Sequence, residues 1–173
     1  NQPRAVILAP SRELAIQIAQ HIEGLSYFTH LSSIAIYGGN DAQNFVNEKK
    51  ALQMGADIIV CTPGRMIAHL NMGYVHMKGL QFLILDEADR MLDMGFIDDV
   101  RDIIQHCGKD RQTLLFSATI PPDLEDLSKE YMKNPVSISA VRMVDPTKLK
   151  QVYYDVKNNA KFSLLVHLLK NEQ

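Results

Sequence analysis

Cysteines and long apolar runs are scarce in this chain. The two cysteines, Cys61 and Cys107, stand alone and fit no paired metal spacing, and the six histidines form no HExxH-type pair, so a zinc site is not expected. Apolar runs reach only about six residues, far short of the ~20 that span a bilayer. No signal-peptide core follows Arg4. We therefore expect no membrane association and a cytoplasmic location, or a nuclear one in a eukaryote.

Positive charge is also in short supply. The chain has 173 residues and a formal net charge of −2, which excludes a globally basic nucleic-acid binder. Local contacts to phosphates through helix N-termini and a few arginines stay possible. The length suits one domain of ordinary size with a real core.

Short apolar runs alternate with helical patterns along the chain. Such repeated βα units predict an α/β fold with a doubly wound, mostly parallel sheet. Helical periodicity follows most of the runs, for example at Leu14, Ile18 and Ile22. The expected strands are residues 5–9, 33–37, 57–61, 82–85, 112–116 and 136–139, with a further weak strand pattern at 151–156.

Three acids within four positions follow the apolar run 82–85. If a helix starts at once, Asp86 and Asp89 share one face of its first turn and Glu87 projects beside them. Such acids could hold a metal ion and a water molecule. The alternative is that Asp86 caps the helix while Glu87 and Asp89 answer its dipole. A cap explains one acid well and three acids poorly.

Unusual clusters follow five of the expected strands. In a parallel sheet all of them converge on one edge, where ligands bind. Each has a structural explanation alone, such as a turn or a helix start, but five at one edge favour a functional site. The clusters are Pro10 to Glu13, Gly38-Gly39, Thr62 to Arg65, Asp86 to Asp89, and Ser117 to Thr119.

In order and spacing, these clusters resemble the motifs of the first core domain of DEAD-box RNA helicases. The run Arg90 to Phe96 matches as well, and the resemblance covers nearly the whole chain. Ser11 stands where the family usually has threonine, which keeps the hydroxyl. The resemblance implies a RecA-like domain, ATP and Mg²⁺ as cofactors, RNA as partner, and ATP-dependent unwinding or remodelling of RNA.

Residue roles follow from the match. Asp86 would hold Mg²⁺ through water, and Glu87 would position and activate the attacking water. Asp89 would pair with Ser117 and Thr119 and link the nucleotide site to domain closure. The implied RNA path reads backbone and shape, with little sequence specificity. Its residues are Pro10, Ser11, Arg12, Gly38, Gly39, Thr62, Pro63, Gly64 and Arg65.

The family's phosphate loop is missing. No G-x-x-x-x-G-K-[ST] phosphate loop occurs, so no phosphate-loop lysine can be named. Relative to the family, we expect an internal, N-terminally truncated fragment that is inactive alone. Its expected parts are residues 1–140, most of the first RecA-like domain; 141–150, an interdomain linker; and 151–173, the start of a second RecA-like domain.

Alternatives remain open. The chain could be an RNA-binding or interaction module without ATPase chemistry, a DNA helicase of a related family, or a Mg²⁺-dependent hydrolase that uses the three acids directly. In the family, the strand 112–116 lies beside the phosphate-loop strand, so in a fragment its open edge could pair with another chain. The oligomeric state and any protein cofactors are not indicated.

Overall fold

The computed structural model describes residues 2–39, 42–139 and 152–171. The chain divides into two compact units, Asn1–Pro135 and Val136–Gln173. The expected linker, residues 141–150, lies outside the described residues.

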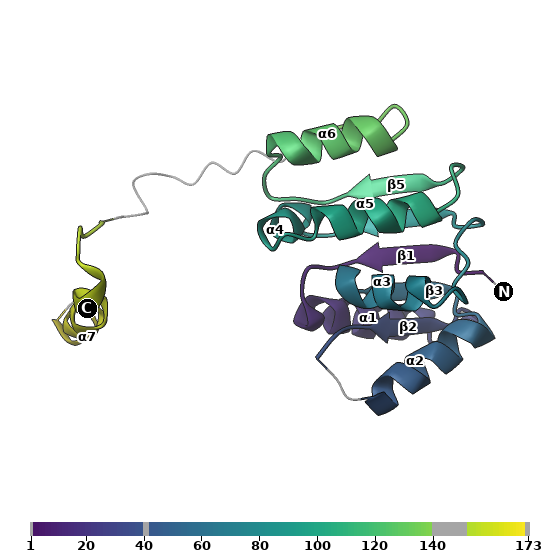
Figure 1. Ribbon diagram of the computed structural model, residues 1–173, viewed down its shortest axis with the longest axis horizontal. Helices are drawn as coiled ribbons and strands as arrows, with labels where there is room; N and C mark the ends of the chain where they lie inside the picture. The colour runs from purple at the N-terminus through teal and green to yellow at the C-terminus, as the bar shows by residue number, and fades with distance from the viewer. Residues whose placement is uncertain (1, 40–41, 140–151, 172–173) are drawn as a thin grey trace. The chain divides into compact units, whose positions relative to one another are not determined.

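The first unit is built on a five-stranded, all-parallel sheet. Its strands lie in the order β2-β3-β1-β4-β5, as Figure 1 shows. This confirms the predicted α/β fold class. The apolar runs form these strands because both faces of a parallel sheet are covered. The bounds are β1 (Ala5–Leu8), β2 (Ser33–Ile36), β3 (Ile58–Cys61), β4 (Phe82–Leu85) and β5 (Gln112–Leu115).

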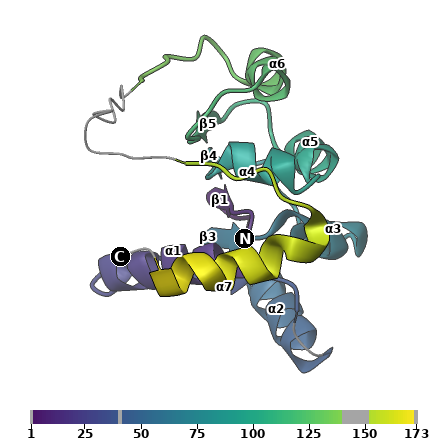
Figure 2. The same ribbon diagram turned by 90° about the vertical axis from the view of Figure 1, so that its left-hand side faces the viewer.

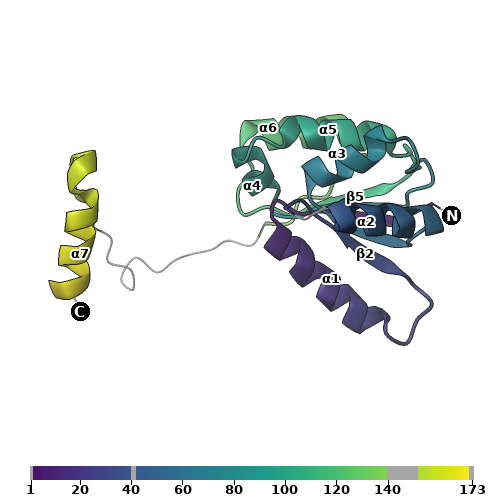
Figure 3. The same ribbon diagram turned by 60° about the horizontal axis from the view of Figure 1, so that its bottom comes forward.

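Helices cover both faces of the sheet. Figure 3 shows α1 (Arg12–Ser26) on one face and α3 (Pro63–Asn71), α5 (Ile97–His106) and α6 (Pro122–Tyr131) on the other. Figure 2 likewise places α3 and α5 on the same side. Successive residues of a strand point to opposite faces of the sheet. Val6 belongs to the large core cluster under α3, α5 and α6, whereas Ile7 packs toward α1. The remaining helices of this unit are α2 (Ala42–Met54) and α4 (Ala88–Asp93).

The strands end in register. Leu8 pairs with Cys61 and Leu85, Ile36 pairs with Cys61, and Leu85 pairs with Leu115. The segments that follow these five residues therefore all leave the sheet at its carboxyl edge. This is the edge at which α/β sheets bind ligands.

Two predicted strands did not form. Residues 136–139 and 152–156 have no regular structure, and residue 151 lies outside the described part. Val136 and Ile138 are exposed. An apolar-polar alternation becomes a strand only when another strand supplies hydrogen-bond partners, and the described residues of the second unit contain none. That unit instead holds the 3₁₀ turn η2 (Asn158–Ala160) and the helix α7 (Lys161–Asn171).

Two further features bear on partners. Strand β5 lies at an edge of the sheet, so pairing with a further strand stays a prediction for this position.

Across the described parts of both units, no helix combines the length and apolar character that crossing a membrane requires.

Gly108 is a position where the fold tolerates no side chain. A Cβ there would lie 2.0 Å from the backbone oxygen of Lys78, because Gly108 N–H donates to the Met77 carbonyl next to a parallel bridge between Met77 and Cys107. We expect Gly108→Ala to lower the free energy of unfolding by about 1–3 kcal/mol. Urea denaturation of the chain measures this change.

The matched control for this substitution is Gly24→Ala. Gly24 lies within α1 and a Cβ there meets nothing within 4 Å. Alanine in a helix is favoured over glycine by about 0.8–1 kcal/mol, so this variant should be as stable as the unsubstituted chain or more so. Equal stabilities of the two alanine variants would contradict the packing at Gly108.

Candidate functional site

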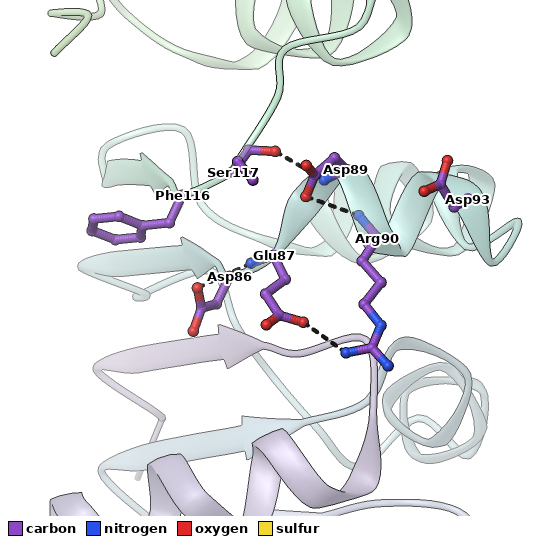
Figure 4. Close-up of a pocket in the computed structure, with 8 residues that line it drawn as sticks. Asp86, Glu87, Asp89, Arg90, Asp93, Phe116 and Ser117 are labelled. Atoms are coloured by element: carbon purple, nitrogen blue, oxygen red, sulfur yellow. Dashed lines mark hydrogen bonds and ion pairs between the residues drawn. The ribbon is translucent and has the colours of Figure 1, made fainter. Parts of the chain in front are cut away.

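A pocket of about 460 Å³ opens where β4 and β5 end. Figure 4 shows side chains from the segment after β4 facing those from the segment after β5. The sheet thus brings together two clusters that lie about thirty residues apart in the sequence. The pocket is lined by Asp86, Glu87, Asp89, Arg90, Asp93, Phe116, Ser117 and Ala118.

Asp89 is the centre of the contacts between the two segments. Its Oδ2 accepts hydrogen bonds from the backbone N–H and the hydroxyl of Thr119, each at 2.9 Å. Its own backbone N–H donates to Ser117 Oγ at 3.1 Å, and the Ser117 hydroxyl donates to the Thr119 carbonyl at 2.6 Å. The structure therefore brings Asp89, Ser117 and Thr119 together.

These bonds favour the charged form of Asp89. Partial burial raises the pKa of its carboxyl group, but the hydrogen bonds from Thr119 and Ser117 outweigh burial and hold the pKa below its usual value. The carboxylate is therefore charged throughout the neutral range and fixes the loop after β5.

The conformation of Glu87 differs from the helical one that was expected for the acids. The helix α4 begins only at Ala88, and Glu87 has φ 47° and ψ 51°, in the left-handed region. Asp86 and Asp89 therefore do not share a helical face. Asp86 is not the helix cap either: its Oδ1 accepts the Glu87 N–H at 3.0 Å, and the capping position is occupied by Glu87.

The backbone on both sides holds Glu87 in this conformation. Asp86 N–H donates to the Leu8 carbonyl and Ala88 N–H donates to the Phe116 carbonyl, each at 3.0 Å. A left-handed non-glycine residue costs about 1–3 kcal/mol, so the surrounding sheet must impose it. The strain lies at a residue that lines the pocket.

The Glu87 carboxylate contacts one cation. Its Oε2 lies 3.1 Å from Arg90 Nη1, and both side chains are well exposed. An exposed pair of this kind stabilises a protein by about 0–1 kcal/mol. The pair can therefore open at little cost when a ligand enters the pocket.

The donor set suits a hydrated magnesium ion better than a protein-built metal cage. Among the described residues, no three His, Cys, Asp or Glu side chains are grouped so that they could hold a metal. Asp86 offers one carboxylate at the pocket. Mg²⁺ characteristically keeps several waters and is bound by one or two carboxylates plus substrate phosphates, and Asp86 fits this pattern.

The first two clusters of the predicted RNA path also meet. Ser11 caps α1, with its Oγ accepting the Leu14 N–H at 3.2 Å. The Arg12 guanidinium lies 5.1 Å from the centre of the Tyr37 ring. A Cβ on Gly39, which has φ 90°, would lie 3.7 Å from Arg12 Nη1. Pro10 is buried and Gly38 is exposed beside them.

The third cluster starts α3. Thr62 is its N-cap residue, without a side-chain cap bond, and Pro63 is the first helical residue, as predicted for a helix start. Gly64 is exposed in the first turn. Arg65 differs from the expected free phosphate ligand: its side chain is only 14% exposed, and its Nε donates to Glu48 Oε2 at 2.7 Å.

Sequence reasoning missed two residues around Arg65. Glu48 and His69 are both buried, and Glu48 Oε2 lies 2.9 Å from His69 Nε2. They are 21 positions apart, on α2 and α3. Neither belongs to a motif, so no local pattern marks them. The only available signal was a histidine on the apolar face of a helix.

Because His69 is buried, we expect the free energy of unfolding to depend on pH. Burial lowers the pKa of its imidazole more than the hydrogen bond and charge of Glu48 raise it, while Arg65 lowers it further. The unfolded chain therefore takes up a proton that the folded chain resists as pH falls below about 6.5. Stability from the neutral, buried His69 is complete above that pH and declines as pH falls toward the folded-state pKa.

The measurement compares the chain with His69→Gln, which cannot titrate. Urea denaturation at several pH values between 7.5 and 5.5 should show the unsubstituted chain losing part of its stability advantage over the variant. The groups that face His69 are Glu48, Arg65 and Tyr74, and Lys49 lies over the Tyr74 ring. A constant difference across this range would contradict the burial effect.

Comparison with known proteins decides the family. Residues 1–127 match the sequence profile of the family described as DEAD/DEAH box helicase. The chain belongs to the DEAD/DEAH box helicase family. The matched range contains all five clusters at the carboxyl edge of the sheet.

Relatives in this helicase family extend well beyond the matched region. The chain is 43% identical to a probable ATP-dependent RNA helicase of Methanocaldococcus jannaschii, covering 100% of this chain and 45% of the relative. It is 39% identical to the ATP-dependent RNA helicase DbpA of Bacillus subtilis, covering 99% of this chain and 36% of that protein. The chain therefore spans less than half the length of these relatives.

Solved helicase structures share the fold. The crystal structure of a DEAD box protein from Methanococcus jannaschii superposes with a TM-score of 0.76 at 43% identity, covering 100% of this chain and 46% of that one. The yeast DEAD-box splicing factor Prp28 gives a TM-score of 0.70 at 36% identity, covering 77% of this chain and 32% of its own.

Proposed function

We propose that this chain supplies the acidic half of the nucleotide site and one side of the RNA path of an ATP-dependent RNA helicase. The observation that carries the proposal is the pocket in which Asp86 and Glu87 lie beside Asp89, itself bound twice by Thr119. The two relatives described above are named as ATP-dependent RNA helicases, one of them as probable.

The three acids take different roles in this proposal. Asp86 holds hydrated Mg²⁺ through water, and the ion, when bound, neutralises charge on the transferring phosphate. Glu87 positions the attacking water and accepts its proton, after its carboxylate leaves Arg90. Asp89 connects the pocket to the loop of Ser117 and Thr119. Phosphoryl transfer suits such a site because its catalysis consists mainly of positioning and charge stabilisation.

RNA binding follows the carboxyl edge of the sheet. The segments after β1, β2 and β3 present a charged Arg12, two glycines and the start of α3 at this edge. Glycine allows phosphates to approach the backbone, and a helix start offers unpaired N–H groups. Contacts of this type favour backbone recognition with little sequence specificity. The proposed path is Pro10, Ser11, Arg12, Gly38, Gly39, Thr62, Pro63, Gly64 and Arg65.

The chain alone is proposed not to hydrolyse ATP. Its sequence contains no G-x-x-x-x-G-K-[ST], the loop whose lysine and backbone hold nucleotide phosphates. In domain terms we propose residues 1–140 as most of a first RecA-like domain, 141–150 as a linker and 151–173 as the start of a second. The division into units at Pro135 supports a boundary in this region.

The test is nucleotide hydrolysis by the full-length protein. We expect hydrolysis of Mg-ATP to be stimulated by single-stranded RNA and much less by DNA of the same sequence. Equal stimulation by DNA would indicate a DNA helicase. Binding of RNA without any hydrolysis would indicate the non-catalytic module. Hydrolysis that does not depend on nucleic acid would reject both the helicase and the non-catalytic module.

A further inference from the structure

A buried polar cluster joins α2 to α3. Glu48 of α2 and His69 of α3 are almost completely buried, and Glu48 Oε2 accepts from Arg65 Nε at 2.7 Å and from His69 Nε2 at 2.9 Å. His69 Nδ1 is hydrogen-bonded to the Tyr74 hydroxyl. The Glu48 carboxylate therefore joins α2 to α3, and His69 connects it to the segment of Tyr74.

The donors and acceptors of this cluster match without an extra proton. A neutral His69 can donate from Nε2 to Glu48 and accept at Nδ1 from the Tyr74 hydroxyl. The negative charge of Glu48 is then paired with Arg65. Because the imidazole is hydrogen-bonded at both nitrogens, its orientation beside the Glu48–Arg65 pair is fixed.

Phe45 fixes the other components of the cluster. Its ring stacks on His69 with 4.3 Å between ring centres and an angle of 10° between the planes. The Arg65 guanidinium lies over the same ring at 4.6 Å. Arg65 is thus held from one face by Phe45 and along its Nε edge by Glu48.

Arg65 is held by the protein itself, with a side chain that is only 14% exposed. Within the described part of the chain, Nη2 of Arg65 is buried and has no hydrogen-bond partner. An unpaired buried guanidinium donor costs free energy. Because Nη2 is buried, it faces the protein interior and not a ligand at the surface.

Stability alone accounts poorly for the cluster. Replacing a buried ion pair by apolar residues of similar volume is often neutral or stabilising, because removing two charges from water is costly. The pair does, however, fix geometry. It ties α2, which follows Gly38-Gly39, to α3, which begins at Pro63 directly after Thr62.

We propose that Glu48 is a positioning residue for RNA binding. It holds Arg65 and the first turn of α3 so that the Gly38-Gly39 and Thr62–Gly64 segments contact the RNA backbone together. This inference rests on the proposed function, since it assigns a support to the same RNA path.

Glu48→Ala in the full-length protein tests this role. We expect the KM for single-stranded RNA in the stimulated ATPase reaction to rise about tenfold or more, as for the loss of one charge-assisted contact. The kcat at saturating RNA and the KM for ATP should stay within about twofold. Glu48→Gln keeps the length and an acceptor oxygen, so it should restore most of the RNA affinity.

Asp57→Ala is the matched control. Asp57 accepts hydrogen bonds from Ser32 N–H at 2.9 Å and from its hydroxyl at 2.8 Å, where β2 and β3 begin, at the opposite ends of the strands. Its loss should lower the Tm without raising the KM for RNA. An equal rise in KM at equal loss of Tm would show that Glu48 acts only through stability, and would overturn the inference.

Other outcomes are also decisive. An unchanged KM in Glu48→Ala, or a Glu48→Gln variant as defective as alanine, would reject positioning by Glu48. If Glu48→Ala does not fold, Glu48→Asp replaces it: the shorter side chain keeps the charge but withdraws from Arg65, and a KM equal to that of the unsubstituted protein would overturn the proposal. Failure of the unsubstituted protein to bind RNA would instead overturn the proposed function itself.

Discussion

Glu87→Gln is expected to lower the RNA-stimulated rate of ATP hydrolysis by the full-length protein by about 10²- to 10⁴-fold, the usual contribution of a positioned general base. Glutamine keeps the length of the side chain but cannot take a proton from water. The pocket backbone should persist, because Glu87 is held by the bonds of Asp86 to Leu8 and of Ala88 to Phe116 rather than by its side chain.

Single-turnover hydrolysis and equilibrium ATP binding separate the possible causes. The rate should fall while the Kd for ATP changes little, because the substitution acts on the chemical step. Asp93→Asn is the control, since Asp93 lines the same pocket and loses the same charge but has no assigned role. Unchanged hydrolysis in Glu87→Gln, or an equal loss in Asp93→Asn, would contradict the assignment.

The sheet and the place of the site could be predicted because they depend on short-range signals. Apolar runs such as residues 82–85 form strands that are covered on both faces, and the sequence alternates them with helices. Once all strands are parallel, their register brings Leu8, Cys61 and Leu85 level. The clusters that follow must then meet at one edge, which the sequence already implies.

The conformation of Glu87 could not be predicted in the same way. Residues 87–92 favour a helix locally, but the helix starts only at Ala88 because Asp86 N–H donates to Leu8 of β1 and Ala88 N–H donates to Phe116, just after β5. These partners are distant in sequence. The local preference therefore wrongly predicts that Asp86 and Asp89 share one face of a helix. It does not change which acids follow β4.

Long-range pairing explains the other differences. Val136 and Ile138 alternate as in a strand, yet strand formation depends on a neighbour that the described residues of that unit lack. Glu48, Arg65 and His69 meet only because α2 and α3 pack together. A motif marks Arg65, but nothing near Glu48 in the sequence indicates that it holds this arginine.

Asp89→Ala should separate unwinding from hydrolysis. The substitution removes the acceptor of both Thr119 hydrogen bonds. Two bonds to a charged group contribute about 3 kcal/mol or more together, so a loop that relays nucleotide binding through them should lose RNA unwinding by about 10²-fold. Hydrolysis at saturating RNA should fall far less, since Asp86 and Glu87 remain in place.

A graded series at Thr119 tests the same link. Thr119→Ser keeps both donors and should unwind RNA normally, whereas Thr119→Val removes only the hydroxyl and should lose about tenfold, as for one charge-assisted bond. Because the pKa of Asp89 lies below its usual value, its carboxylate is charged at every pH of a neutral-range assay, and the order of the variants should not change with pH there. Equal losses of unwinding and hydrolysis in Asp89→Ala would show that Asp89 supports the pocket as a whole. Losses confined to unwinding would place the link between nucleotide and RNA in the two bonds from Thr119.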